Sequence, residues 1–159
     1  MLMSWRDVWR DPGHVLAFGF GSGLLPQAPG TWGTVAAIPL YWILSHYNWQ
    51  VYLFVTTLAF FIGIFVCGRT ARILGVHDDP RIVWDEIVGY LLTMFLMPSG
   101  WFWIVVGFGL FRLFDIWKPQ PIRWVDARVT GGLGIMLDDV LAAFFAWIVL
   151  VLLARGIHV

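Results

Sequence analysis

The chain has 159 residues, of which 60% are hydrophobic and only 13% are charged, and its formal net charge is zero. Ordinary soluble domains contain about 45–50% apolar residues, so the excess must face lipid or a partner. The neutral charge balance gives no indication of nucleic-acid binding. The single Cys67 excludes an internal disulfide and a metal site built from several cysteines. We expect an integral membrane protein, with no obligatory protein partner evident.

The chain is expected to form one membrane-embedded domain over residues 1–159. Residues 1–30 predict an interfacial segment followed by a glycine- and proline-rich loop. The short apolar run inside this segment is followed by no small-residue cleavage site, so we expect no cleaved signal peptide. Residues 31–159 are predicted to form a helical bundle.

Apolar runs within the bundle predict an all-α fold. The uncharged runs 31–47 and 49–67 have the length of a spanning helix, about 17–25 residues. Two apolar runs between residues 87 and 111 flank a break at 98–100, and each covers about half of the hydrocarbon core. They form either a re-entrant hairpin or two full helices. With a last run at 140–154, we expect a bundle of about four to five hydrophobic helices.

Basic residues predict the orientation of these helices, because they accumulate on the cytoplasmic side. With the N-terminus inside, nine of the ten lysine and arginine residues and all ten acidic residues fall on the cytoplasmic side. Only Arg155 falls outside. We therefore expect a multi-pass protein whose polar chemistry faces the cytoplasm.

Acidic residues stand at the inner ends of three hydrophobic segments: Asp85-Glu86, Asp115 and Asp138-Asp139. Ionisable groups at such positions are costly and mostly functional. Helix capping is an alternative for Asp85 or for Asp138, which would lie in the first turn of the last helix. Carboxylates gathered at one depth repel one another unless a cation or protons neutralise them. Oxygen ligands suit Mg²⁺ or Mn²⁺, so we expect a divalent metal site.

Basic residues and a glycine-rich helix start accompany these acids. Arg112, Asp115 and Lys118 are spaced i, i+3, i+6 and would share one helix face. Cations beside a metal are suited to a phosphoryl group. Gly30-Thr31 opens the first hydrophobic helix, where exposed N–H groups can bind an anion. Thr31 is the expected N-cap.

Several catalytic mechanisms are excluded. The residue that a Cys-x₅-Arg motif would require to be arginine is Ile73, and no Asp-x-Asp motif or P-loop lysine is present. Among the histidines only His77 has acidic neighbours, so a metal-dependent route remains. An ion-coupled transporter would also use intramembrane acids, but transporter sites lie at the bilayer midplane. A non-catalytic scaffold would have little need for paired aspartates.

Taken together, these blocks resemble the phosphatidylglycerophosphatase A family over roughly residues 18–142. The blocks that carry the resemblance are Gly21-Ser22-Gly23-Leu24-Leu25-Pro26, Pro29-Gly30-Thr31-Trp32-Gly33, Val76-His77-Asp78 with Ile82-Val83-Trp84-Asp85-Glu86, Phe111-Arg112-Leu113-Phe114-Asp115-Ile116-Trp117-Lys118-Pro119, and Gly131-Gly132-Leu133-Gly134-Ile135-Met136-Leu137-Asp138-Asp139. The sequence departs from the family pattern at Thr130, where a histidine is expected, and at Ala143, where a glycine is expected.

The resemblance implies a Mg²⁺-dependent enzyme of the bacterial inner membrane that converts phosphatidylglycerophosphate to phosphatidylglycerol and phosphate. The expected partners are therefore the phospholipid substrate and the membrane. The expected metal ligands are Asp85, Glu86, Asp138 and Asp139. The expected catalytic residues are Asp85, Asp115, Lys118 and Asp139, with Asp115 either completing the metal site or acting as general base. The expected substrate-binding residues are Gly30, Thr31, Arg112, Lys118 and Arg123.

Overall fold

The computed structural model describes residues 5–76 and 79–157, and within these ranges all secondary structure is helical. In chain order the elements are α1 (Trp5–Arg10), α2 (Pro12–Ala17), the 3₁₀ helix η1 (Gly19–Leu24), α3 (Pro29–Leu44), α4 (Trp49–Leu74), α5 (Trp84–Thr93), α6 (Trp101–Trp117), α7 (Ile122–Arg128) and α8 (Gly131–Ile157). Among these elements α4 and α8, with 26 and 27 residues, are long and apolar enough to cross a membrane. The expectation of an all-helical protein with apolar helices of spanning length is confirmed.

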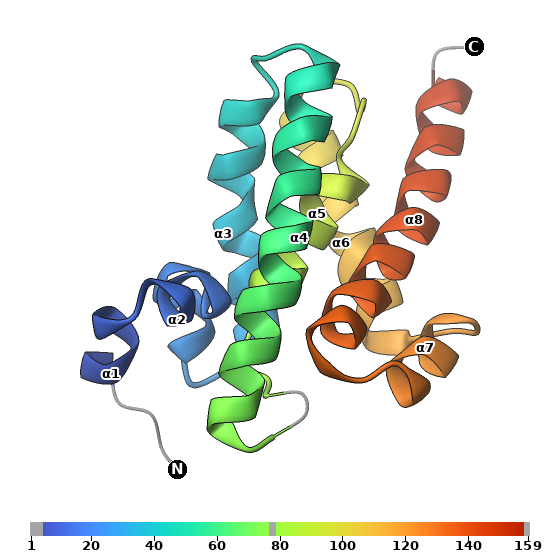
Figure 1. The fold of residues 1–159 in the computed structure, drawn as a ribbon. Coiled ribbons are helices and arrows are strands. Elements are labelled where there is room, and N and C mark those ends of the chain that lie inside the picture. Colours follow the sequence, from blue (N-terminus) through green and yellow to red (C-terminus); the bar gives the residue numbers. More distant parts are fainter. Residues whose placement is uncertain (1–4, 77–78, 158–159) are drawn as a thin grey trace.

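The helices form a bundle with two distinct ends (Figure 1). The turn between α3 and α4 lies at one end, together with the C-terminal end of α8. The opposite end carries α1, α7 and the start of α8. Inside the bundle α5 is almost fully buried, because it packs against α3, α4, α6 and α8. The polar start of α5 is thereby held among the ends of its neighbours.

The predicted hairpin between the first two hydrophobic segments is present. Asn48 is the N-cap of α4, and its side-chain oxygen accepts a hydrogen bond from the Val51 N–H at 2.9 Å. This is the usual N-cap arrangement, which satisfies one of the unpaired N–H groups at a helix start. At its other end α4 extends beyond the uncharged run to Leu74, where Gly75 ends it in the left-handed conformation with φ of 70°.

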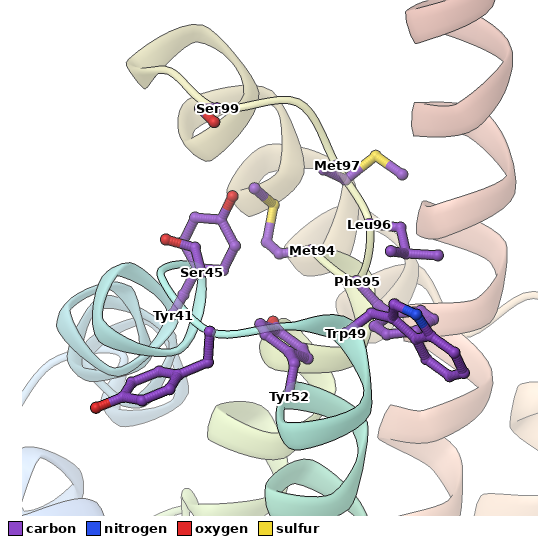
Figure 2. A pocket seen from close by; sticks show the side chains of 10 residues that line it. Tyr41, Ser45, Trp49, Tyr52, Met94, Phe95, Leu96, Met97 and Ser99 are labelled. Carbon is purple, nitrogen blue, oxygen red and sulfur yellow. The ribbon is translucent and has the colours of Figure 1, made fainter.

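The predicted break at residues 98–100 is part of a longer irregular segment. Helix α5 ends at Thr93, and regular structure resumes only at Trp101. Figure 2 shows Met94 of this segment near Tyr41, and Met97 beside Leu96 further along the segment. All of them line one cavity of about 260 Å³ with residues of the turn between α3 and α4. The segment that joins α5 to α6 therefore reaches the end of the bundle that carries the α3–α4 turn.

The N-terminal segment is attached to α4 by polar contacts. Arg69 donates two hydrogen bonds to the carboxylate of Asp11, at 2.9 and 2.7 Å. These bonds from Arg69 hold the pKa of Asp11 below its usual value. His14 forms a buried hydrogen bond of 2.9 Å with Thr70, and Phe18 is fully buried. The interfacial location expected for residues 1–30 stays a prediction, but α2 is anchored to the bundle.

Candidate functional site

A cavity of about 340 Å³ lies where the starts of α3 and α5 meet the end of α6 and the first half of α8. All five of the acidic residues singled out from the sequence line it, and so do three of the expected substrate-binding residues. These lining residues are Asp85, Glu86, Asp115, Asp138, Asp139, Gly30, Arg112 and Lys118. The packing of the helices therefore brings together groups that are widely separated in the sequence.

Helix boundaries exclude a first-turn capping role for Asp138 and Asp139, whereas Asp85 keeps its first-turn position. Helix α8 begins at Gly131, about two turns before Asp138 and Asp139. The expectation that Asp138 lies in the first turn of this helix is therefore wrong. The glycines at the start of α8 lie inside the helix, where α8 crosses α4 closely. A Cβ at Gly132 would overlap the carbonyl oxygen of Ile64 on α4, so only glycine permits this close crossing. Asp85 does lie in the first turn of α5, but Val83 holds the N-cap position, and no side chain caps this helix.

Three of the carboxylates form a compact cluster. Asp85, Glu86 and Asp139 each offer one ligand oxygen, and these atoms all lie within 4.8 Å of one another. Asp85 and Asp139 are only 8% and 3% exposed. One buried oxygen of each carboxylate has no hydrogen-bond partner among the described residues: Asp85 Oδ1, Glu86 Oε2 and Asp139 Oδ2.

Such a cluster is unfavourable without a counter-charge. Buried carboxylate oxygens that lack a partner are costly, and neighbouring negative charges add mutual repulsion. A hard divalent cation with oxygen ligands would offset both the cost of the unpaired oxygens and the repulsion between the carboxylates. Mg²⁺ is commonly bound through a small number of carboxylates. The donor set therefore fits the metal expected from the sequence.

Arg112 faces this cluster from α6. Its guanidinium forms a short ion pair with Asp115, one turn further along the helix, and lies 3.7 Å from Glu86. The predicted i, i+3 relationship on one helix face is confirmed for this pair. Gly30 packs against both groups, since a Cβ there would overlap Glu86 Oε1 and would lie 3.1 Å from the terminal nitrogens of Arg112. A residue with a Cβ at this position would therefore displace the Glu86 carboxylate.

Lys118 contributes the second cation. It ends α6 in the left-handed conformation, with φ of 45°, and its Nζ donates to Asp138 Oδ2 at 2.6 Å and to Asp126 Oδ1 at 3.0 Å. Burial opposes the charge of Lys118, but the two carboxylates outweigh this and raise its pKa. The sequence did not single out Asp126. Its spacing of eight residues from Lys118 crosses a turn with two prolines, so no helix periodicity relates the two.

Two expected residues lie elsewhere. Thr31 is not the N-cap of α3, because Ala28 holds that position and Pro29 begins the helix, as proline favours the first helical position. The Thr31 N–H instead donates to the Ala28 carbonyl at 2.9 Å. Arg123 is exposed on α7 and does not line the cavity, so its substrate-binding role stays a prediction. His77 lies outside the described residues.

A buried carboxylate cluster that faces two cations, at one end of an apolar helical bundle, is the arrangement expected of a membrane-associated phosphate-ester hydrolase. Comparison with known proteins agrees with this class. The model of the family Phosphatidylglycerophosphatase A matches residues 15–154. The chain belongs to this family and is a phosphoric monoester hydrolase.

Several relatives cover most of the chain. It is 48% identical over 138 residues to phosphatidylglycerophosphatase A of Escherichia coli (strain K12), covering 86% of this chain and 80% of the relative. It is 50% identical over 141 residues to the Haemophilus influenzae protein of the same name, covering 87% and 86% of the two chains. A putative phosphatidylinositol-3-phosphatase of Bacteroides thetaiotaomicron is 38% identical over 152 residues, covering 90% of this chain and 93% of the relative. No solved structure matches the chain.

Proposed function

We propose that this protein removes the terminal phosphate of phosphatidylglycerophosphate and releases phosphatidylglycerol at the cytoplasmic face of a bacterial inner membrane. The observation that carries the proposal is the single cavity in which three buried carboxylates face Arg112 and Lys118. The substrate is inferred from the names of the relatives from Escherichia coli and Haemophilus influenzae. The ion-coupled transporter is not favoured, because the chain belongs to a family of phosphatases.

Mg²⁺ is the proposed cofactor, held by Asp85, Glu86 and Asp139, with Asp138 beside them. When bound, it would supply Lewis-acid stabilisation of phosphoryl charge and activation of water. The support for this assignment is that one buried oxygen of each of Asp85, Glu86 and Asp139 lacks a hydrogen-bond partner in the described part of the chain.

The chain's own cations would bind the phosphate. Arg112 and Lys118 are positively charged donors on the wall of the cavity, and such donors stabilise a phosphoryl group through charge-assisted hydrogen bonds. Asp115 holds the Arg112 guanidinium through their ion pair. Lys118 is held in the same way by Asp126 and Asp138. These carboxylates therefore keep the two cations oriented before the substrate binds.

The lipid part of the substrate would remain in the bilayer. Ile116 lines the cavity and is 71% exposed, so an apolar surface adjoins the polar groups. A substrate entering from the membrane could keep its acyl chains in lipid while its phosphate reached Lys118. This placement gives a physical reason for a phosphatase to be built from apolar helices.

The proposed orientation can be tested by labelling. Cys67 is buried, so in a Cys67→Ala background single cysteines can be placed at exposed Ser99 and at exposed Thr130. Ser99 shares a cavity with residues of the α3–α4 turn, and Thr130 lies between α7 and α8. The α3–α4 turn and the start of α8 lie at opposite ends of the bundle. We expect a membrane-impermeant maleimide to label Ser99→Cys from the periplasmic side and Thr130→Cys only after permeabilisation. Labelling of Thr130→Cys from the periplasmic side, or of Ser99→Cys only after permeabilisation, would contradict the proposed orientation.

The activity is tested by phosphate release from phosphatidylglycerophosphate in detergent, with Mg²⁺ or with a chelator. We expect release that requires the metal and falls by at least about 100-fold in Asp139→Asn, because a ligand carboxylate is lost. Asp11→Asn is the matched control, since Asp11 pairs with Arg69 and does not line the cavity. Release that persists in chelator, or in Asp139→Asn, would exclude the proposed site. A folded sample that releases no phosphate would exclude the function.

A further inference from the structure

A second groove lies between α4 and α8, apart from the catalytic cavity. It has a volume of about 450 Å³ and is lined by Phe61, Ile64, Phe65, Gly68, Arg72, Gly131 and Gly132. None of these residues lines the catalytic cavity. The proposed phosphatase site therefore does not account for this groove.

The close crossing of the two helices shapes the groove. Gly132 of α8 packs against the Ile64 carbonyl of α4, and a Cβ at Gly68 would lie 2.9 Å from the Gly132 nitrogen. Figure 1 shows α4 and α8 approaching each other toward the end that carries α7. Beside this contact the side chains of Phe61 and Phe65 remain 62% and 68% exposed. The apolar wall of the groove therefore belongs to a helix of membrane-spanning length.

One cation ends this apolar stripe. The α4 residues that line the groove, at positions 61, 64, 65, 68 and 72, follow the i, i+3, i+4, i+7 pattern of one helix face. Arg72 follows Phe65 by seven residues, about 10 Å along the helix axis. Arg72 also lines an adjoining cavity of about 290 Å³ with Gly75 and Val76, past the end of the apolar stripe. The guanidinium thus lies between an apolar groove and an open space near the end of α4.

The contacts that Arg72 makes with the described residues do not neutralise its charge. Its Nε donates to the Gly68 carbonyl at 3.2 Å, which orients the guanidinium over the groove. Two nearby arginines behave differently, since Arg69 pairs with Asp11 and Arg81 pairs with Asp79. Among the described residues no ion pair of Arg72 is present.

We propose that this groove binds one anionic phospholipid of the surrounding bilayer, with its phosphodiester on Arg72 and an acyl chain along Phe61 and Phe65. The match is one of charge and shape. A guanidinium is a strong partner for phosphate oxygens because its donors form paired hydrogen bonds. The neighbouring wall of the groove consists of apolar side chains and glycine backbone, which suit the acyl chain of the bound lipid. The proposal requires α4 to lie in a membrane, but it does not depend on the catalytic assignment.

Native mass spectrometry of the full chain in detergent can test this site. The protein is titrated with phosphatidylglycerol or with phosphatidylcholine of the same acyl chains. We expect the wild type to retain one phosphatidylglycerol about tenfold more tightly than phosphatidylcholine. Both headgroups carry the phosphodiester, but the quaternary ammonium of phosphatidylcholine adds a positive charge that repels Arg72. Arg72→Gln should abolish this preference. Phe65→Ala should weaken retention of both lipids and leave the preference unchanged.

Arg128→Gln is the matched control. Arg128 is an exposed arginine on α7 that stacks over Trp124 and lines neither cavity. The proposal would be overturned if Arg128→Gln and Arg72→Gln lost the preference for phosphatidylglycerol equally. Equal retention of the two lipids by the wild type would also overturn it. A dimer that disappears in Arg72→Gln would assign the groove to a second copy of the chain and would also overturn it. Unchanged phosphatase activity in Arg72→Gln shows that the variant folds, whereas lipid retention without any phosphatase activity would contradict only the proposed function.

Discussion

Replacement of Gly30 by alanine should separate activity from stability. The added methyl group would overlap Glu86 Oε1 and press on the guanidinium of Arg112. The Cβ would lie 2.1 Å from this oxygen, so the carboxylate must move by more than about 1 Å to restore an ordinary van der Waals distance. The overlapping atom is the end of a flexible side chain, so we expect little change in stability. Alanine also favours the helix over glycine by up to about 1 kcal/mol.

Activity should respond far more strongly than stability. A displacement of about 1 Å in a positioned catalytic group can lower turnover by about 100-fold, and Glu86 belongs to the carboxylate cluster. Turnover on phosphatidylglycerophosphate and thermal unfolding are measured for Gly30→Ala and for Gly109→Ala. Gly109 is the control, because it lies in α6 and a Cβ there would meet nothing within 4 Å. Wild-type turnover in Gly30→Ala would refute the idea that Glu86 must be held in its present position.

Lys118→Gln should lower kcat/KM by about 100-fold, because a charged donor to phosphate is lost, and steady-state kinetics measure this change. Asp126→Asn should cost less, about tenfold, since Asp138 still holds the lysine; a larger loss than in Lys118→Gln would show that Asp126 has a role of its own. The hydrogen bonds from Arg81 lower the pKa of Asp79, so their contribution to stability is present above the ordinary aspartate pKa and is lost as the pH falls through the lower folded value. Asp79→Asn should therefore lower the unfolding temperature at pH 7 and at pH 5, and the difference should narrow only below about pH 4. A constant difference down to pH 2 would contradict this assignment.

Much of the helical architecture was predictable, because a long apolar run in the sequence indicates a helix without any knowledge of tertiary contacts. The turn before Asn48 and the break near Ser99 were both located from the sequence. Helix boundaries were less accurate. Helix α8 begins nine residues before the uncharged run at 140–154. Its first turns contain glycines, which a sequence reading assigns to a loop but which the close crossing with α4 requires.

The candidate site was predictable as a set of charges at one depth, but its contacts were not. The depth of these charges along the bundle follows from the positions at which they interrupt the hydrophobic segments. These positions can be seen directly in the sequence. Which carboxylate meets which cation depends on helix rotation and on turn geometry. The sequence therefore missed Asp126 as a partner of Lys118 and expected Thr31 at an N-cap that Ala28 occupies.

The sequence by itself determined that the chain is helical and apolar, that it belongs to its family, and that its acids gather at one end of the helices. Local composition and motif order carry this information, because they need no partner residue to be recognised. Only the tertiary structure decided which acids share one cluster, that Gly30 leaves room for Glu86, and that Arg72 lines a groove apart from the catalytic cavity. These features are distances between helices, and side-chain packing sets such distances only when the whole bundle is assembled.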